Sequence, residues 1–557
     1  MTVYLFIFQQ IHTYTIKHFI LKNSEFRIPN SKTITHYAFQ SNYALCITNY
    51  ELRKRHSMVT TNDENLIYSK HQVLEEVCRL AWEDNLNEDA KDAIPYKLVP
   101  GPRPTYRCCI YKEREIIRNR VRLATGSNLS FEYENRNIVQ VIKPACDDCP
   151  IASYSVTDNC RYCLGKACIN SCRFDAIHYG NTRMYIESDK CKECGMCAKA
   201  CPFGAIVHLE RPCKRSCPVG AISYDEYGFC QIDEEKCISC GRCIHSCPFG
   251  AIGSKVYLVD IIKAIKSGRE VIAMCAPATE GQYGKDVTMD SIRQTLKKIG
   301  FSDMVEVGLG GDMTAAYEAA EWSEAKKEGR KMTTSCCPAF ISLLKRHFPE
   351  QYEKNMSTTV SPMCAISRYL KATHPGCVTV FIGPCIAKKS EAADKSVEGN
   401  ADYVITYGEL YALMRSRDIE DFEKSEEPYQ EASVYGKKFA GSGGVAAAVL
   451  EVMAERGEDV SDITLLTCAG GPECVKALQM LKAGKLQEDF IEGMACPGGC
   501  VGGPSRHATD AEVERNRRVL LKNADSRKVL DNLRNYPMDK FSMHRDGHME
   551  GEVKTGN

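Results

Sequence analysis

The segment MVEVGLGGDMTAAYEAAEW at residues 304–322 runs from an apolar, strand-like stretch through a glycine loop into a helical pattern. Strands that end in a glycine or cysteine loop recur at residues 271–278, 378–392 and 463–481, the last two again leading into helices. Repeated units of this kind predict parallel sheets with helices on their faces, and they place ligands beyond the carboxyl ends of the strands. We therefore predict an α/β fold with its functional site in these loops.

Length and charge exclude few classes of protein but do limit the partners. The 557 residues leave room for roughly three or four domains. Lysine plus arginine equal aspartate plus glutamate at 72 each, so no overall field favours nucleic acid or a membrane surface. No run of about 18 apolar residues is present, and no membrane span is predicted.

Thirty-one cysteines are the strongest compositional feature. The first residues, MTVYLFIFQQ, lack the basic region and small-residue cleavage site of a secretory signal, which disfavours exported disulfides. Most cysteines stand two or three residues apart, which is typical of thiolates around a metal cluster in a reducing compartment. The pattern predicts a cytoplasmic iron-sulfur protein.

Between Cys146 and Ile252 the sequence repeats itself, with CP-x-GAI beginning at Cys201, Cys217 and Cys247. Two runs match C-x2-C-x2-C-x3-C-P, namely Cys191, Cys194, Cys197, Cys201 and Cys237, Cys240, Cys243, Cys247. In such a run three thiolates bind one 4Fe-4S cluster and the fourth binds a second cluster. Zinc ribbons use pairs of cysteines separated by longer stretches, so the spacing favours iron-sulfur.

Pairing these runs predicts three to four clusters in this region. The three sets fixed by the motifs are Cys160, Cys163, Cys168, Cys201; Cys191, Cys194, Cys197, Cys172; and Cys237, Cys240, Cys243, Cys217. The remaining thiols, Cys146, Cys149, Cys213 and Cys247, suffice for a fourth. Two alternatives remain open: Cys230 takes part, or Cys146 and Cys149 are structural.

Three further cysteine loops follow strand-like stretches: TTSCCPAF at 333–340, GPCIAKKSEA at 383–392 and EGMACPGGCVGGP at 492–504. Pro338 suits the first turn of a helix, so Cys336 and Cys337 are expected near a helix N-terminus, where the dipole favours thiolate. Each loop alone could hold an ordinary buried thiol, but three of this kind favour a shared metal site.

These loops resemble the three signature segments of the FeFe (iron-only) hydrogenases over about residues 255–535. The resemblance implies a two-lobed catalytic domain whose H-cluster combines a 4Fe-4S cube with a diiron unit carrying CO, cyanide and a dithiolate. It assigns the cube to Cys337, Cys385, Cys496 and Cys500, with Cys500 also bridging to the diiron unit. It further implies that Cys336 passes protons, Lys388 bonds a cyanide, Met494 lines the pocket, and Glu318, Glu321 and Ser357 form the proton path.

The implied reaction is the reversible reduction of two protons to hydrogen, with electrons passing through the 4Fe-4S clusters from ferredoxin or flavodoxin. Hydrogenase maturation proteins are the other implied partners. Splitting hydrogen needs a metal, a nearby base and a relay to water, which suits these residue types. Without the family register, a solvated helix face is the plainer interpretation of Glu318 and Glu321.

The chain departs from the usual family pattern at Gly383, Phe340, Pro504, Cys364 and Ala325, the last standing where the proton path commonly has arginine. These changes resemble the divergent group B branch. Two alternatives from other classes are a non-catalytic iron-sulfur assembly scaffold, which typically lacks the paired SCC, and a hydrogen sensor, which usually carries a signalling domain.

The predicted division has five parts. Residues 1–57 are either a disordered extension or an over-long start, residues 58–145 a mainly helical accessory domain, and residues 146–252 α+β ferredoxin-like repeats. Residues 253–535 form the H-cluster domain and residues 536–557 a flexible tail. The basic stretch Arg103–Arg122 is either a solvated helix face or a docking patch for an acidic ferredoxin.

Overall fold

The structure is a computed structural model that describes residues 64–129, 137–147, 149, 154–425, 429–524 and 526–547. All of them belong to one compact unit, Val59–Asn557. The predicted extension 1–57 and the last ten residues of the predicted tail lie outside these ranges. Among the described helices, none has both the length and the apolar character needed to cross a bilayer.

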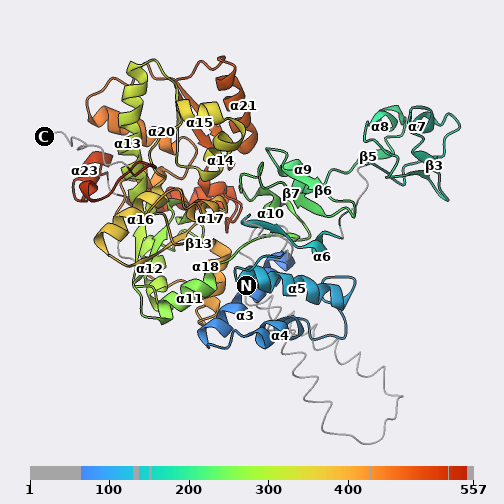
Figure 1. Ribbon diagram of the computed structural model, residues 1–557, viewed down its shortest axis with the longest axis horizontal. Helices are drawn as coiled ribbons and strands as arrows, with labels where there is room; N and C mark the ends of the chain where they lie inside the picture. The colour runs from blue at the N-terminus through green and yellow to red at the C-terminus, as the bar shows by residue number, and fades with distance from the viewer. Residues whose placement is uncertain are drawn as a thin grey trace, which may run out of the picture. The chain divides into compact units, whose positions relative to one another are not determined.

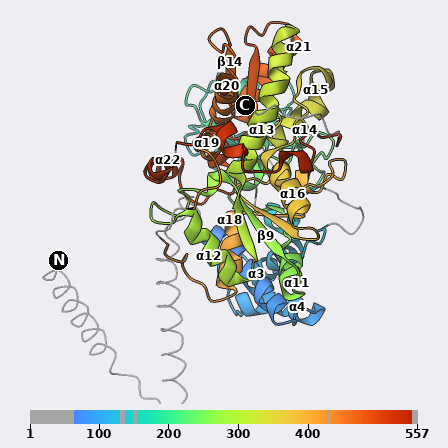
Figure 2. The ribbon, with the colours of Figure 1, turned by 90° about the vertical axis from the view of Figure 1, so that its left-hand side faces the viewer.

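Four parallel strands form the first sheet, in the order β10 (Asp303–Glu306), β9 (Val271–Cys275), β12 (Val378–Ile382) and β13 (Tyr403–Ile405). Every residue of β9 and β12 is buried, as expected of parallel strands covered on both faces. The covering helices include α11 (Leu258–Lys266), α12 (Met289–Ile299), α16 (Pro362–Thr373) and α18 (Tyr407–Arg415) (Figure 2).

Three parallel strands form a second sheet, in the order β11 (Met332–Thr333), β15 (Phe490–Met494) and β14 (Leu465–Ala469). Helices α14 (Pro338–His347), α15 (Pro349–Asn355) and α21 (Gly471–Lys482) pack beside it. The central strand β15 is buried throughout. Two helix-covered parallel sheets confirm the predicted two-lobed α/β class.

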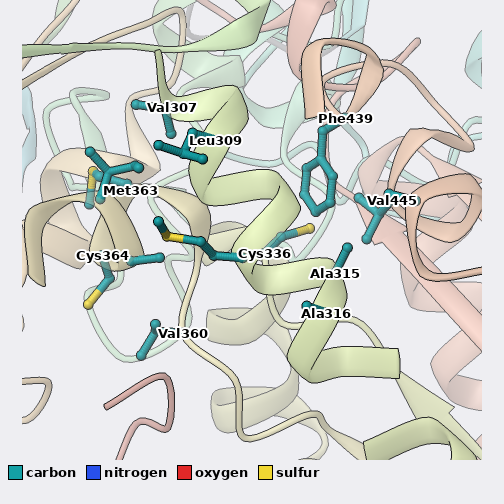
Figure 3. Packing of buried hydrophobic residues seen from close by; sticks show 14 of the residues in the cluster. Val307, Leu309, Ala315, Ala316, Cys336, Val360, Met363, Cys364, Phe439 and Val445 are labelled. Atoms are coloured by element: carbon teal, nitrogen blue, oxygen red, sulfur yellow. The ribbon is translucent and has the colours of Figure 1, made fainter. Parts of the chain in front are cut away.

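Helix α13 (Val307–Lys327) is the longest element of the catalytic region and packs against both lobes. Its partners are α16, α19 (Val434–Lys438), α20 (Gly444–Glu455) and α23 (Val529–Leu533). A side-chain carbon at Gly310 would lie 2.3 Å from the carbonyl oxygen of Pro362, so glycine permits the close approach of α13 to α16. Figure 3 shows Phe439 and Val445 on one side of α13, with Met363 and Cys364 on the other.

The contact between α13 and the second sheet is aromatic. Trp322 is buried and stacks on Phe490 of β15, with ring centroids 4.3 Å apart. Replacing a buried aromatic side chain of this size by alanine typically costs about 3–5 kcal/mol of stability. This stack therefore holds α13 firmly in place beside the loop that follows β11.

Helices α3 (Glu64–Trp82), α4 (Glu88–Leu98) and α5 (Ile110–Ala124) form the predicted accessory region and pack on one another (Figure 1). Their apolar residues Val77 and Val121 belong to the same buried cluster as Val271 and Val380 of the first sheet. The accessory helices thus share a core with the first lobe.

Two ferredoxin-like modules follow. The first has the antiparallel pairs β2 (Tyr154–Val156) with β5 (Ile206–His208) and β3 (Ile177–Tyr179) with β4 (Met184–Ile186), and the short helices α7 (Ala167–Asn170) and α8 (Met196–Ala200). The second has β6 (Ile222–Tyr224) with β7 (Cys230–Ile232) and β1 (Val139–Val141) with β8 (Ile252–Ser254), and the helices α6 (Lys143–Cys146), α9 (Pro212–Ser216) and α10 (Arg242–Ser246). The predicted α+β repeats are confirmed.

The last described residues pack on the catalytic region. A strap at residues 541–547 follows the last 3-10 turn, η4 (Met538–Lys540). The remaining elements of the catalytic region are the helices α17 (Ala387–Ala392) and α22 (Asp510–Leu520) and the 3-10 turns η1 (Pro277–Thr279), η2 (Cys500–Gly502) and η3 (Leu521–Asn523). Val360 donates its backbone N–H to Met543 O at 2.7 Å, and Arg545 donates to Thr358 O at 3.0 Å. The sequence predicted a flexible tail from residue 536, whereas this strap is held by backbone hydrogen bonds.

Candidate metal centre

One buried cavity of about 70 Å³ is lined by Cys240 of the second ferredoxin-like module and by five thiols from three loops of the catalytic region. They are Cys336, Cys337, Cys385, Cys496 and Cys500. The loops follow β11, β12 and β15, so both sheets deliver them from the carboxyl ends of parallel strands. Apart from the thiols and Lys388, the lining is mostly apolar, including Val307, Met363, Phe381, Phe439 and Met494.

Local capping explains why these loops hold their shape. Cys337 is the N-cap of α14, with Pro338 at the first helical position. In the third loop, the Glu492 carboxylate accepts hydrogen bonds from Gly443 N at 2.7 Å and Ala446 N at 2.9 Å, which ties the loop to the start of α20. A side-chain carbon at Gly493 would lie 2.4 Å from the Phe340 ring, so this glycine leaves room for that phenylalanine.

Lys388 lies at the cavity wall with its ammonium group fully engaged. Its Nζ donates to Ser361 Oγ at 2.8 Å and to Glu391 Oε2 at 2.7 Å, and it lies 3.5 Å from Cys336 O. Burial lowers the pKa of Lys388, but Glu391 and the nearby thiols outweigh that effect and raise it. A charged donor is therefore retained beside the thiols. Met494 is buried, with Sδ 3.9 Å from Cys500 Sγ.

A line of polar groups runs from Cys336 along α13. Glu318 is fully buried, and its Oε1 accepts hydrogen bonds from Ser335 N and Ser335 Oγ, both at 2.8 Å. Burial raises the pKa of Glu318 to about 7 against the effect of these bonds. Burial and the Glu318 carboxylate also raise the pKa of the Cys336 thiol, which directly follows Ser335 in the chain.

Glu321 continues the line one turn further along α13. Its Oε1 accepts from Thr358 Oγ1 at 2.5 Å and from Thr359 Oγ1 at 3.1 Å. Burial alone would raise the pKa of Glu321, but hydrogen bonds from His544, Thr358, Ser357 and Thr359 lower it. Ser357 is buried and affects the pKa of both carboxyls, so it lies between them. The three predicted path residues are thus brought together with Cys336.

The structure brings the predicted cluster cysteines together in the predicted sets. One small cavity is lined by Cys172, Cys191, Cys194 and Cys197, and another by Cys217, Cys237, Cys240 and Cys243. Burial and the thiols of Cys201 and Cys163 raise the pKa of Cys168, while Cys160 lies in the same apolar cluster. Cys240 also lines the central cavity, so the second module contacts the catalytic region at that thiol.

The fourth set also converges. Burial and the thiols of Cys213 and Cys247 raise the pKa of both Cys146 and Cys149. Cys230 lies in the same place: its backbone N–H donates to Cys146 Sγ at 3.4 Å. Both alternatives for this site therefore stay open: Cys230 takes part in the cluster, or Cys146 and Cys149 are structural.

Among the described residues, no three His, Cys, Asp or Glu side chains converge on a point that would suit a single metal ion. The thiolates of a four-iron cube bind different corners, so they need not converge in this way. The donor set at the central cavity is thiol-rich and contains no carboxylate, which suits iron-sulfur rather than magnesium, calcium or manganese.

The basic stretch Arg103–Arg122 is largely committed within the chain. Arg107 donates to Phe249 O, Arg114 to Val99 O and Pro100 O, and Arg120 to Ser69 Oγ at 2.6 Å. These contacts leave few arginines of the stretch available for docking an acidic partner.

Two functional candidates escaped sequence reasoning. His544 contacts Thr358 and Glu321 at the outer end of the polar line, and Arg545 donates from Nη2 to Ser335 O at 2.9 Å. Both stand in the segment predicted to be a flexible tail, and no local motif marks them. The one signal in the sequence was Ala325, which stands where the proton path of the family commonly has an arginine.

Residues 269–504 match the model of the "Iron only hydrogenase large subunit, C-terminal domain". Residues 269–504 thus form a domain of the FeFe hydrogenase type. Residues 207–258 match an LdpA Fe-S cluster-binding domain and residues 184–207 a 4Fe-4S binding domain, so this FeFe hydrogenase relative is an iron-sulfur protein. The resemblance predicted from the cysteine loops is confirmed.

Known relatives include both hydrogenases and a protein of another kind. An NADP-reducing hydrogenase subunit of Solidesulfovibrio fructosivorans is 27% identical over 64% of this chain and 63% of its own length. Iron hydrogenase 1 of Clostridium pasteurianum is 28% identical over 59% of this chain and 66% of its own length. A "Probable cytosolic Fe-S cluster assembly factor" of Anopheles gambiae is 25% identical over 39% of this chain and 56% of its own length.

The chain thus spans slightly less than two thirds of the length of the two hydrogenases. Among solved structures, an apo FeFe-hydrogenase from Chlamydomonas reinhardtii matches with 22% identity over 47% of this chain and 87% of that one, at a TM-score of 0.39.

Proposed function

We propose that this chain is an FeFe hydrogenase that interconverts molecular hydrogen with two protons and two electrons. The observation that carries the proposal is the position of Cys336, which lines the thiol cavity and directly follows Ser335, the donor to the buried carboxylate of Glu318. A scaffold that only holds a cube has no use for a buried acid group connected to a thiol that binds no iron. The departures at Gly383, Phe340 and Ala325 further assign the chain to the divergent group B branch.

The residues at the cavity fit an H-cluster. Cys337, Cys385, Cys496 and Cys500 would hold the cube, and Cys500 would bridge to the diiron unit. Lys388, a charged donor at an otherwise apolar wall, would bond a cyanide, and Met494 would pack against the unit. When bound, the diiron unit supplies the metal at which hydrogen is split or formed.

The chain's own residues move the proton. Cys336 exchanges it with Glu318, whose pKa of about 7 lets the carboxyl gain and lose a proton near neutral pH. Ser357 lies between Glu318 and Glu321, and its hydroxyl can pass the proton between the two carboxyls. Electrons take a separate route through the 4Fe-4S clusters, the nearest of which would be held in part by Cys240 at the cavity. Ferredoxin or flavodoxin is the proposed carrier, and maturation proteins are the proposed source of the diiron unit.

Infrared spectroscopy of maturase-treated protein tests the function. We expect bands from iron-bound CO and cyanide, together with hydrogen evolution from a reduced viologen dye. The control is the same protein treated without maturases, which should keep its cubes and lack the bands. A treated protein that binds iron yet shows neither bands nor hydrogen would favour the scaffold function, which the similarity to the Anopheles gambiae protein keeps as the second candidate.

Iron analysis tests the fourth cluster. Replacing both Cys146 and Cys149 by serine should lower the iron content of the reconstituted full chain by about four, because one 4Fe-4S cube loses half of its ligands. A double serine variant of Cys108 and Cys109 is the control, since these adjacent thiols belong to none of the proposed sets. Unchanged iron in the first variant would make Cys146 and Cys149 structural. A loss of about four irons on Cys230→Ser as well would make Cys230 a participant.

A further inference from the structure

The outer end of the polar line is closed by the strap at residues 541–547, which lies outside the matched family segment. Arg368 of α16 holds the strap from the side: its Nη1 donates to Ser542 O at 2.6 Å and to His544 O at 2.8 Å. His544 also forms a β-bridge with Thr359. These contacts fix the backbone of His544 and therefore the placement of its ring.

The imidazole of His544 lies directly against the last carboxylate of the line. Its Nδ1 is 2.7 Å from Thr358 Oγ1 and 3.5 Å from Glu321 Oε1. Because Thr358 Oγ1 donates to Glu321 Oε1 at 2.5 Å, the hydroxyl hydrogen is used and Nδ1–H is the natural donor to Thr358. A continuous hydrogen-bonded chain then runs from His544 through Thr358 to Glu321.

The outer end of the line lies just beneath the protein surface, where Thr358 is exposed and the His544 ring is largely buried. The side chain of His544 is 10% exposed and that of Glu321 17% exposed, whereas Glu318 is fully buried. Two side chains of α13 face the ring: the Glu321 carboxylate and Tyr317, whose ring is edge-on to the imidazole. The nearby charged groups are Arg368, which bonds the backbone of His544, and the next two residues of the strap, Arg545 and Asp546. The Glu321 carboxylate is the near anion that would stabilise a protonated imidazole.

We propose that His544 exchanges protons with Glu321 through Thr358, as part of the outer end of the relay. A proton bound at one ring nitrogen leaves from Nδ1 to Thr358 Oγ1, while the Thr358 proton moves to Glu321 Oε1. Only N–H and O–H bonds form and break, and no electrons are transferred. Histidine suits this step because its two ring nitrogens can bind and release protons near neutral pH. The inference rests on the proposed hydrogenase function.

Activity measurements with cofactor controls test the role. His544→Gln keeps a polar side chain of similar size but cannot carry the proton, so hydrogen evolution should fall about 10- to 100-fold with iron content and CO and cyanide bands unchanged. His544→Ala should lose as much and regain activity when imidazole is added to the buffer. The control is His374→Ala, since His374 also contacts a carboxylate, Glu270 Oε1 at 3.0 Å, and is not part of the relay.

A second measurement is independent of turnover. Hydrogen–deuterium exchange at the histidine C2 position, followed by mass spectrometry, gives the pKa of each histidine in the protein before maturase treatment. Glu321→Gln should lower the pKa of His544 by about one pH unit and leave that of His374 unchanged, because an anion within about 4–6 Å favours the charged imidazole.

The outcomes separate this proposal from the proposed function. Wild-type protein that lacks CO and cyanide bands and hydrogen turnover would overturn the function itself. Two outcomes with active wild-type protein would overturn only the role of His544. The His544→Gln variant could be as active as the wild type, or imidazole could fail to restore the activity lost in His544→Ala. An unchanged His544 pKa in Glu321→Gln would likewise break its coupling to the relay.

Discussion

Hydrogen evolution by the Cys336→Ala variant should fall about 100- to 10,000-fold while its CO and cyanide infrared bands persist. Cys336 lines the cavity beside Cys337 but is not one of the four proposed cube ligands. Alanine cannot bind a proton, and losing a positioned acid or base typically costs this much in rate. The cube and the diiron unit should still assemble, because their ligands are intact.

The matched control is Cys364→Ala. Cys364 is also buried and belongs to the same apolar cluster as Cys336 (Figure 3), yet it is not among the residues that line the cavity. Removing its sulfur tests the loss of packing alone, so this variant should keep near-normal turnover. Full activity of Cys336→Ala, or an equal loss in both variants, would overturn the relay role of Cys336.

The Cys500→Ala variant should have no diiron bands and no hydrogen evolution above background. Cys500 lies at the cavity with Met494 Sδ at 3.9 Å and is the proposed bridge between the two parts of the H-cluster. A missing thiolate removes one cube corner and the attachment of the diiron unit together, whereas Cys336→Ala breaks only proton transfer. The two variants therefore differ in their infrared spectra as well as in rate.

Cys377→Ala controls for the removal of a buried thiol. Cys377 is buried just before β12 and lies in none of the described cysteine cavities. Its variant should keep both bands and turnover. Retention of the diiron bands in Cys500→Ala would remove Cys500 from the ligand set.

Much of the centre could be predicted because ligand spacing is a local property. Thiols two or three residues apart must lie close together, so the runs at 191–201 and 237–247 predicted their clusters directly. The alternation of apolar strands with glycine loops predicted the parallel sheets in the same way. Likewise, Pro338 predicted that a helix begins directly after Cys336 and Cys337, and α14 begins there.

What the sequence determined by itself was therefore the set of thiols, the class of fold and the family. What only the tertiary structure decided was which distant groups meet. Thr358 and His544 are 186 residues apart, and the strap that joins them carries no motif. Glu318 reads as a helix-surface residue until the packing of α13 seals it, and burial then raises its pKa to about 7. Residue spacing left the role of Cys230 open, and the fold places it in β7 beside Cys146. Such effects depend on long-range packing and desolvation, which residue spacing does not encode.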